Sequence, residues 1–178
     1  MNEFKRLKRE LVYQGKIVSF YKDTVQTPGG HIVDWDFIGH KGAAAVVPVR
    51  EDGKILMVRQ YRNALDRYTL EIPAGGLNGA EEPTLHAAAR ELEEETGYKS
   101  SHLELLITIR TTVAFCNEKI DIYVADQLEK SHQNLDEDEL IDVEAYDIEE
   151  LSRMILEGRI EDSKTIAALM SYKDKYCK

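Results

Sequence analysis

The chain has 178 residues and a mass of 20.3 kDa, which suits one domain of ordinary size. Its hydrophobic fraction of 43% and charged fraction of 31% are typical of a folded globular protein and argue against extensive disorder. The formal net charge of −10 argues against an obligate nucleic-acid binder, which needs a basic surface. No apolar run approaches about 18 residues, so we expect no membrane partner, and the polar N-terminus does not resemble a secretory signal.

The two cysteines, Cys116 and Cys177, form neither a zinc-binding spacing nor a disulfide framework. We therefore expect a cytoplasmic protein, because the cytosol keeps thiols reduced. The acidic balance still allows phosphate-containing small molecules as ligands, since a bound metal ion can supply positive charge.

The N-terminal part is rich in β-prone side chains over residues 9–39, and Pro28-Gly29-Gly30 marks a turn between two strands. This segment is too small to bury both of its faces, so we expect it to lean on the rest of the molecule or on a second copy. We divide the chain into an N-terminal antiparallel β-region, residues 1–40, and a main domain, residues 41–178.

The main domain begins with short strands. Residues 43–49 are almost continuously apolar and predict a buried strand, in which Pro48 indicates an edge or a strand end. After a turn, residues 55–61 are expected to return as the second strand of a hairpin. Another strand, 68–72, is followed by a loop over 73–76.

The clearest helix follows this loop. Pro83 suits its first turn, acidic residues precede it, and Gly97 is a natural C-terminal stop. An apolar stripe marks the face expected to be buried: Leu85, Ala88, Ala89 and Leu92. The remaining elements are strands over 103–110, 120–125 and 141–146 and helices over 148–157 and 163–175. Together they predict a mixed α/β or α+β domain.

Three glutamates share one face of this helix, because Glu91, Glu94 and Glu95 stand at i, i+3 and i+4. Like charges at this spacing repel by about 0.2–0.5 kcal/mol per pair; Arg90 can relieve Glu94 at i+4, but nothing basic stands four residues from Glu91. A hard divalent cation would relieve the cluster, since Mg²⁺ prefers carboxylate oxygens. On the glutamates alone, a solvated acidic helix face is the simpler interpretation.

The spacing over residues 76–98 resembles the Nudix box, G-x5-E-x7-R-E-U-x-E-E-x-G-U, in which U is aliphatic. The positions that match it are Gly76, Glu82, Arg90, Glu91, Leu92, Glu94, Glu95 and Gly97. Only Tyr98 departs, at the last aliphatic position. Because so many fixed positions agree without a gap, the chain is identified as a member of the Nudix hydrolase family.

This resemblance implies the family's fold, a mixed β-sheet sandwiched between helices, and its reaction, the attack of water on a phosphorus of a nucleoside diphosphate derivative. It implies that Glu91, Glu94 and Glu95 are metal ligands, and that Glu91 and Glu95 are also catalytic. The backbone carbonyl of Gly75 or Gly76 would complete the metal shell. The implied metal is Mg²⁺, with Mn²⁺ able to replace it.

Four motif positions are assigned structural roles by the same resemblance. Arg90 orients the glutamates through charge-assisted hydrogen bonds rather than touching substrate. Glu82 is either a peripheral metal ligand or a structural partner of the loop. Gly76 and Gly97 shape the loops at the two ends of the box.

Outside the box, three segments resemble the ADP-ribose pyrophosphatase branch of the family: residues 58–62 (VRQYR), 70–76 (LEIPAGG) and 117–120 (NEKI). The resemblance assigns Arg62 and Glu71 to substrate binding, with Arg62 on the diphosphate or the terminal ribose, as suits a bidentate phosphate ligand. The alternative for Arg62 is a surface ion pair.

Enzymes of this branch are typically dimers that exchange an N-terminal β-region, so a homodimer is implied. Trp35, with Asp36 beside it, occupies the place of an aromatic residue that stacks on adenine from the other subunit. The alternative for Trp35 is a packed aromatic residue of the sheet.

An acidic loop over residues 136–139 lies where this branch keeps a catalytic glutamate that takes a proton from the attacking water. Glu137 and Glu139 both qualify, and Glu139 is slightly favoured. At least two of the four acids are interpreted as solvated turn residues.

The implied reaction is Mg²⁺-dependent hydrolysis of ADP-ribose or a related ADP-sugar to AMP and a sugar phosphate. One departure stands against ADP-ribose itself: many enzymes of the branch have Ser-Pro-Gly after the box, where this chain has Thr112-Val113-Ala114. Another ADP-sugar, GDP-mannose or a dinucleotide therefore remains open as the substrate. Further alternatives are a non-catalytic nucleotide-sugar sensor and a hydrolase of oxidised nucleoside triphosphates.

Overall fold

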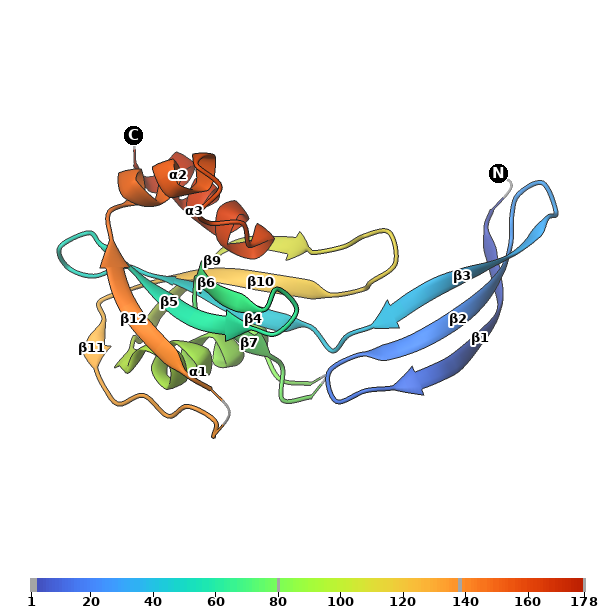
Figure 1. The fold of residues 1–178 in the computed structure, drawn as a ribbon, viewed down its shortest axis with the longest axis horizontal. Helices are drawn as coiled ribbons and strands as arrows, with labels where there is room; N and C mark the ends of the chain where they lie inside the picture. The colour runs from blue at the N-terminus through green and yellow to red at the C-terminus, as the bar shows by residue number, and fades with distance from the viewer. Residues whose placement is uncertain (1–2, 80, 138, 178) are drawn as a thin grey trace. The chain divides into compact units, whose positions relative to one another are not determined.

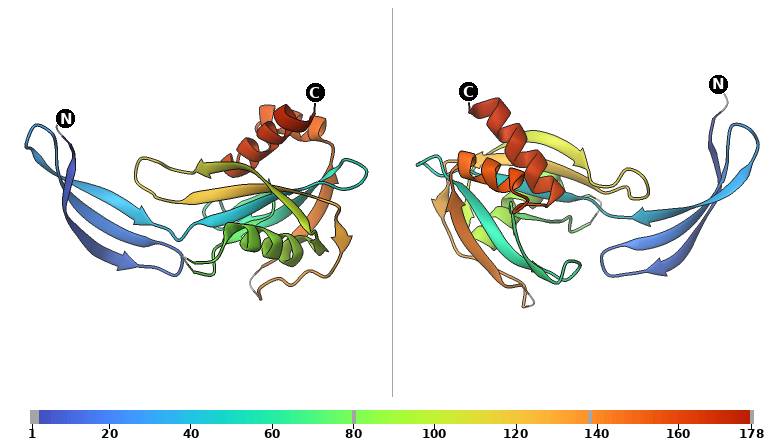
Figure 2. Two further views of the ribbon diagram at one scale, coloured as in Figure 1. Left: turned by 180° about the vertical axis from the view of Figure 1, so that it is seen from behind. Right: turned by 45° about the horizontal axis from the view of Figure 1, so that its top comes forward.

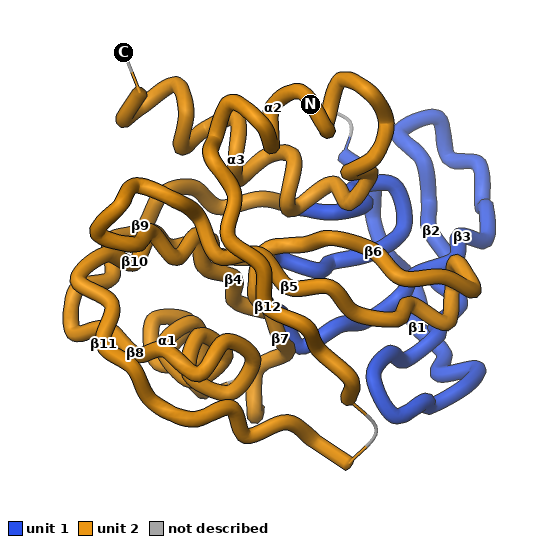
Figure 3. Tube along the Cα trace, turned by 60° about the vertical axis from the view of Figure 1, so that its left-hand side comes forward, with its two compact units in different colours: residues 1–42, 110–119 blue, residues 43–109, 120–178 orange. Residues whose placement is uncertain are grey.

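The computed structural model describes residues 3–79, 81–137 and 139–177. The chain divides into two compact units (Figure 3). The first consists of Met1–Gly42 and Arg110–Lys119, and the second of Ala43–Ile109 and Ile120–Lys178. The main boundary lies close to the division expected at residue 40, but the distant segment Arg110–Lys119 joins the first unit.

The first unit holds a three-stranded antiparallel sheet in the order β1-β2-β3. Its strands are β1 (Lys5–Gln14), β2 (Ser19–Gln26) and β3 (Ile32–Gly39). The predicted turn at residues 28–30 is confirmed, whereas β1 begins earlier than the predicted residue 9. Every residue of β1 is exposed, as expected of a sheet that cannot bury both faces by itself.

The segment Arg110–Lys119 lies along the end of β3. The backbone N–H of Ile38 donates to the Phe115 carbonyl at 2.7 Å, and the N–H of His40 donates to Asn117 Oδ1 at 2.8 Å. This segment contains Thr112-Val113-Ala114, where the chain departs from the Ser-Pro-Gly of its branch. The departure therefore lies on a segment that is hydrogen-bonded to the end of β3. Val113, in place of the usual proline, is 83% exposed.

The second unit contains two larger sheets. Their strands are β4 (Ala43–Pro48), β5 (Ile55–Arg62), β6 (Arg67–Glu71), β7 (Ala74–Gly76), β9 (His102–Arg110), β10 (Lys119–Asp126) and β12 (Ile141–Tyr146). One sheet has the order β7-β4-β10-β9 and is mixed, because β10 is parallel to β4 and β7 is antiparallel to it. The other is antiparallel, in the order β12-β5-β6. The short strands β8 (Tyr98–Lys99) and β11 (Glu129–Lys130) pair with each other.

Two strand predictions are wrong. The hairpin expected between β4 and β5 does not form, because the two strands lie in different sheets and share only the isolated bridge between Val49 and Ile55. β4 is buried throughout and pairs with β7 on one side and β10 on the other, so neither of its edges is left for β5. The expected loop over 73–76 contains strand β7. Pro48 ends β4, as one of the two predictions for it required.

Three helices of the described residues match the predicted ones. They are α1 (Thr84–Thr96), α2 (Ile148–Leu156) and α3 (Ser163–Tyr176). Within the second unit, α1 covers one face of the mixed sheet and α2 and α3 cover the other (Figures 1 and 2). The predicted fold of a mixed sheet between helices is therefore confirmed. No helix in the described ranges is long and apolar enough to cross a membrane.

The side chains of β4 alternate between these two layers. Ala45 and Val47 belong to the core that includes Leu169 of α3, whereas Ala44 and Val46 belong to the clusters that include residues of α1. This alternation is the two-residue period of a strand that is buried on both faces. It fixes α1 against the centre of the sheet.

The buried face of α1 differs from the predicted apolar stripe. Leu85 is 42% exposed, whereas Glu91 and Glu95 are buried together with Ala88 and Leu92. The helix begins after Pro83 and ends at Gly97, whose φ of 70° is the left-handed conformation that glycine adopts readily. Two of the three glutamates thus point into the domain rather than into solvent.

Candidate active site

The acidic face of α1 borders a pocket of about 330 Å³ in the second unit. Its walls come from β7 and the turn after it, from α1, and from the segment that precedes β12. The residues that line it are Ala74, Gly75, Gly76, Asn78, Arg90, Glu91, Glu94, Asn134, Asp136 and Glu139. Most of these side chains are polar or acidic, which favours a small charged ligand or an ion over an apolar one.

Glu95 is the most buried of the three glutamates, at 3% exposure. Its Oε2 accepts a hydrogen bond from the backbone N–H of Ala74 at 3.1 Å. Burial and the neighbouring charge of Glu91 raise the pKa of Glu95 to about 8, although Ala74 and Arg62 oppose this shift. The ionised form of Glu95 is therefore costly in the metal-free protein.

Glu91 is held against the backbone of β7. A Cβ added to Gly75 would lie 2.0 Å from Glu91 Oε1, so only glycine leaves room for this carboxylate. A Cβ added to Gly76 would meet nothing within 4 Å. Burial raises the pKa of Glu91 as well, against the opposing charge of Arg90.

Arg90 joins the glutamates to the loop before the helix. Its Nη1 donates to Glu91 Oε1 at 2.6 Å and to Glu94 Oε2 at 2.9 Å, and its Nη2 donates to the Gly76 carbonyl at 3.2 Å. Arg90 therefore contacts Glu94 at i+4, as expected, and also the adjacent Glu91. Burial opposes the charge of Arg90, yet its acidic neighbours hold its pKa above the usual value.

Glu82 closes the turn between β7 and α1. Its Oε2 accepts from the backbone N–H of Asn78 at 2.5 Å, and its Oε1 accepts from Arg90 Nε at 3.3 Å. The hydrogen bond from Asn78 lowers the pKa of Glu82. These contacts are those of a structural partner of the loop, one of the two roles considered for this residue.

The donor chemistry of the pocket suits a hard divalent cation. Among the residues that the structure describes, the carboxylates do not stand as a ready cluster of three ligands, because Arg90 holds Glu91 and Glu94 while Ala74 holds Glu95. Two of these carboxylates are nevertheless buried with raised pKa values, and a cation offsets both the burial and the repulsion.

The side chains of Arg62 and Glu71 meet across the β5-β6 pair, although Arg62 stands opposite Arg67 at the turn and Glu71 stands opposite Val58. Arg62 donates through Nε and Nη2 to the two carboxylate oxygens of Glu71, at 2.8 and 2.6 Å. Glu71 chiefly, and Glu95 to a smaller extent, raise the pKa of Arg62, so Arg62 lies within electrostatic reach of the acidic pocket. Glu71 itself is buried.

The other predicted site residues are placed less uniformly. Glu137 and Glu139 are both exposed, but only Glu139 lines the pocket and contributes to the raised pKa of Glu95. Asp138, between them, lies outside the described residues. Trp35 and Asp36 lie on β3 of the first unit, where Trp35 is half exposed and its ring centroid lies 5.7 Å from that of Phe4.

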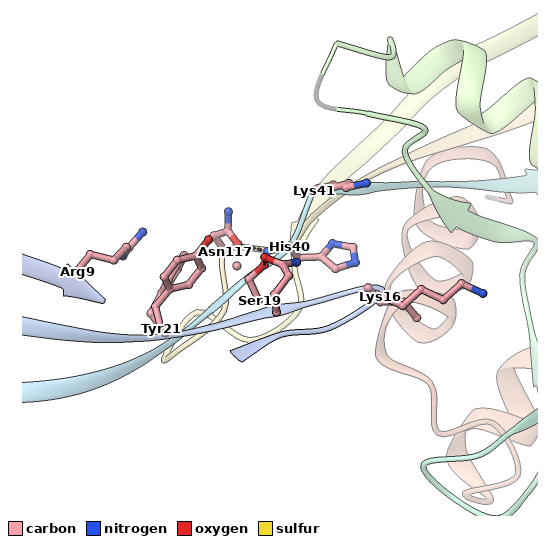
Figure 4. Close-up of a pocket in the computed structure, with 11 residues that line it drawn as sticks. Arg9, Lys16, Ser19, Tyr21, His40, Lys41 and Asn117 are labelled. Atoms are coloured by element: carbon pink, nitrogen blue, oxygen red, sulfur yellow. Dashed lines mark hydrogen bonds between the residues drawn. The ribbon is translucent and has the colours of Figure 1, made fainter. Parts of the chain in front are cut away.

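A second pocket, of about 440 Å³, lies within the first unit (Figure 4). Ser19, His40 and Asn117 gather at its centre, whereas Lys16 and Lys41 extend away from Arg9. None of the predicted site residues lines this pocket. Its cations do not converge on one point, so it does not have the arrangement of a phosphate site.

Sequence analysis missed Lys164, which is buried and donates to Glu71. A signal for it exists, since a lysine directly after the Asp162-Ser163 start of a helix opposes the helix dipole. It also missed Asn134 and Asp136 as residues of the pocket wall. Asp136 belongs to the acidic loop that the sequence marks, but no local pattern marks Asn134, because the fold brings this segment to α1.

We expect Gly75→Ala to displace the Glu91 carboxylate and Gly76→Ala to leave it in place, because only the first adds a methyl group in contact with it. The measurement is the rise in melting temperature of each purified variant on addition of Mg²⁺. Wild type and Gly76→Ala should show the rise and Gly75→Ala should lose most of it. Equal rises in both variants would contradict the close contact between Gly75 and Glu91.

We expect Glu95→Gln to stabilise the metal-free protein at neutral and basic pH. The folded-state pKa of Glu95 is raised, so the folded protein binds more protons than the unfolded one between its ordinary value and about 8, and wild-type stability falls as pH rises through this range. Glutamine keeps the acceptor for Ala74 without the charge. The gain should reach the order of 3 kcal/mol at pH 8 and shrink toward pH 5, as followed by urea unfolding. Identical pH profiles for the two proteins would contradict the buried charge.

Comparisons with known proteins agree with this fold. The NUDIX domain family model matches residues 39–169. A "methanol dehydrogenase activator" of Bacillus methanolicus is 41% identical over 94% of this chain and 91% of its own length. An "ADP-ribose pyrophosphatase" of Bacillus subtilis (strain 168) is 36% identical over 94% of this chain and 91% of its own. An "ADP-ribose pyrophosphatase" of Mycobacterium tuberculosis is 35% identical over 96% of this chain and 83% of its own length.

A solved structure supports the same fold. The solved structure "Crystal structure of ADP compounds hydrolase" matches this protein with a TM-score of 0.85. The match covers 97% of this chain and 93% of the chain in that structure. At 19% identity, this likeness shows the fold alone. The family model and the relatives that match over nearly the whole chain show more: this chain belongs to the Nudix family and is a Nudix hydrolase.

Proposed function

We propose that this Nudix hydrolase cleaves the diphosphate of ADP-ribose or a related ADP-sugar, releasing AMP and a sugar phosphate. The observation that carries the proposal is the buried pair Glu91 and Glu95 at an acidic pocket, which suits a cation, while the guanidinium of Arg62, whose pKa Glu95 helps to raise, suits the phosphate of a substrate. The two relatives named as ADP-ribose pyrophosphatases support the substrate class, since they match over nearly the whole chain.

In this proposal Glu91, Glu94 and Glu95 hold Mg²⁺, with Mn²⁺ as a substitute, and the Gly75 carbonyl completes the set of ligands. When bound, the cation supplies charge neutralisation at the phosphoryl oxygens and lowers the pKa of water. Arg90 orients the carboxylates that it contacts.

The remaining roles belong to side chains around this centre. Arg62 binds the diphosphate, and Glu71 acts by holding Arg62 through two hydrogen bonds. Glu139 accepts the proton of the attacking water, because it lines the pocket beside the glutamates and Glu137 does not.

We also propose a homodimer in which the N-terminal sheet packs on a second copy. Support comes from β1, which is exposed along its whole length. Large apolar side chains of the same unit are exposed as well: Phe4, Leu7, Leu11, Val12, Tyr13, Ile17, Ile32 and Trp35. In such a dimer Trp35 stacks on the adenine bound by the partner copy, and Asp36 lies beside it in the sequence. The free thiols of Cys116 and Cys177 agree with a cytoplasmic location.

A second candidate function follows from the 41% identical relative, which is named an activator of methanol dehydrogenase. In that case the chain acts on an alcohol dehydrogenase system, and a higher dehydrogenase rate on its addition would favour this function. Because the loop at Thr112, Val113 and Ala114 departs from the branch, GDP-mannose and dinucleotides are also tested as substrates. A nucleotide-sugar sensor would bind a nucleotide sugar without hydrolysing it.

We expect purified protein to release AMP from ADP-ribose only when Mg²⁺ is present. Glu139→Gln should lower kcat by about 10²–10⁴-fold if Glu139 is the base, whereas Glu137→Gln, its matched control in the same loop, should leave kcat unchanged. The measurement is chromatographic detection of AMP under initial-rate conditions. Absence of AMP with ADP-ribose, together with turnover of GDP-mannose or a dinucleotide, would overturn the proposed substrate.

A further inference from the structure

Lys164, in the first turn of α3, is a buried lysine that the roles above do not use. It is 8% exposed, and its Nζ donates to Glu71 Oε2 and, at 2.9 Å, to Asp162 Oδ2. A cation in the first turn faces the positive end of the helix dipole, and burial of an ammonium group is costly even when it is paired. Helix stability therefore does not account for a lysine at this position.

The first turn of α3 also contacts the backbone that leads from β6 to the acidic pocket. Thr165 Oγ1 accepts a hydrogen bond from the backbone N–H of Ile72 at 3.0 Å. Two residues later, the N–H of Ala74 donates to Glu95. Lys164 and Thr165 thus contact two successive residues, Glu71 and Ile72, at the corner between β6 and β7.

Lys164 and Arg62 share one carboxylate oxygen. Arg62 Nη2 donates to Glu71 Oε2 at 2.6 Å, and Lys164 Nζ donates to the same atom. Thr69 Oγ1 occupies the other oxygen together with Arg62 Nε. Burial opposes the ionisation of Glu71, but these donors lower its pKa to about 2, so Glu71 stays charged and its oxygens are filled by protein groups.

The shared oxygen has a consequence for Arg62. Asp162 Oδ2 accepts from Lys164 Nζ as well as from the backbone and hydroxyl of Thr165, so the charge of Asp162 offsets that of Lys164. Lys164 therefore acts on Glu71 chiefly through a charge-assisted hydrogen bond, which fixes the carboxylate that Arg62 binds. Arg62 is the more exposed of the two cations and the one that a ligand can reach.

We propose that Lys164 is a positioning residue for diphosphate binding, which holds Glu71 by a charge-assisted hydrogen bond and thereby keeps Arg62 oriented toward the substrate. The inference rests on the proposed function, because it takes Arg62 as the ligand of the diphosphate. Lys164 itself contacts Glu71 and Asp162 and acts through Arg62.

Lys164→Met removes the ammonium group and keeps a chain of similar length. Lys175→Met is the matched control, since Lys175 lies in the same helix and pairs with Glu104 on the surface. The substrate is the one that wild type hydrolyses fastest among ADP-ribose, GDP-mannose and a dinucleoside polyphosphate. We expect Lys164→Met to raise KM about tenfold and change kcat less than about threefold, as suits one charged hydrogen bond used in binding. Lys175→Met should change neither constant.

The decisive readout repeats the substitution in an Arg62→Ala background. If Lys164 acts through Arg62, Lys164→Met lowers kcat/KM about tenfold in wild type and less than about twofold when Arg62 is absent. A general disturbance of the fold acts equally in both backgrounds. Equal losses of kcat/KM in the two backgrounds would overturn the proposal.

Lys164→Gln keeps the proposal open to contradiction if Lys164→Met does not fold, because it retains a donor for Glu71 without the charge. A KM equal to that of wild type in either variant overturns the proposal. Wild-type turnover of GDP-mannose or the dinucleotide without turnover of ADP-ribose refutes the proposed function alone, and the Lys164 comparison is then made on the active substrate. A wild type inactive on all three refutes both.

Discussion

The burial of two neighbouring carboxylates is the constraint on which the rest of this structure depends. Glu91 and Glu95 project from α1 into the domain, where burial raises both pKa values, helped by the charge of Glu91 at Glu95 and by the charges of Glu94 and Glu139 at Glu91. Such a pair lowers the stability of the metal-free protein, and a proton or a cation relieves it. The surroundings hold the pair in place, because Gly75 leaves space for one carboxylate and the N–H of Ala74 binds the other.

The sheet order brings these groups together. β7 pairs with β4 so that Ala74 lies opposite Ala45 and Gly75 opposite Ala44, while the Ala44 side of β4 packs against α1. The strand that offers backbone to the glutamates is thus fixed beside the helix that carries them. On the neighbouring sheet, Glu71 at the end of β6 holds Arg62 and is held in turn by Lys164 of α3. Each layer of the second unit therefore contributes a contact to the pocket or to the guanidinium of Arg62.

Local patterns predicted the helices, most strands and the residues of the box, since capping residues, short periods and fixed spacings depend only on neighbours in sequence. They did not predict how strands pair: β4 takes its parallel partner β10 from far along the chain, so the expected hairpin with β5 was wrong. Burial also escaped them, because Glu91 is buried where Leu85 is exposed. The contact of Lys164 with Glu71 depends on how α3 packs on the sheets, which no spacing encodes.

The central claim, that the buried glutamate pair is a cation site, is tested most directly by titrating Mn²⁺ into metal-free protein and following the electron paramagnetic resonance signal of free Mn²⁺. Glu93→Gln is the control, because Glu93 lies on the same helix and bonds to Ser131. We predict that wild type and Glu93→Gln remove Mn²⁺ from the free pool, and that Glu91→Gln and Glu95→Gln each weaken binding by at least about tenfold. Binding by both of these variants with the affinity of wild type would contradict the claim.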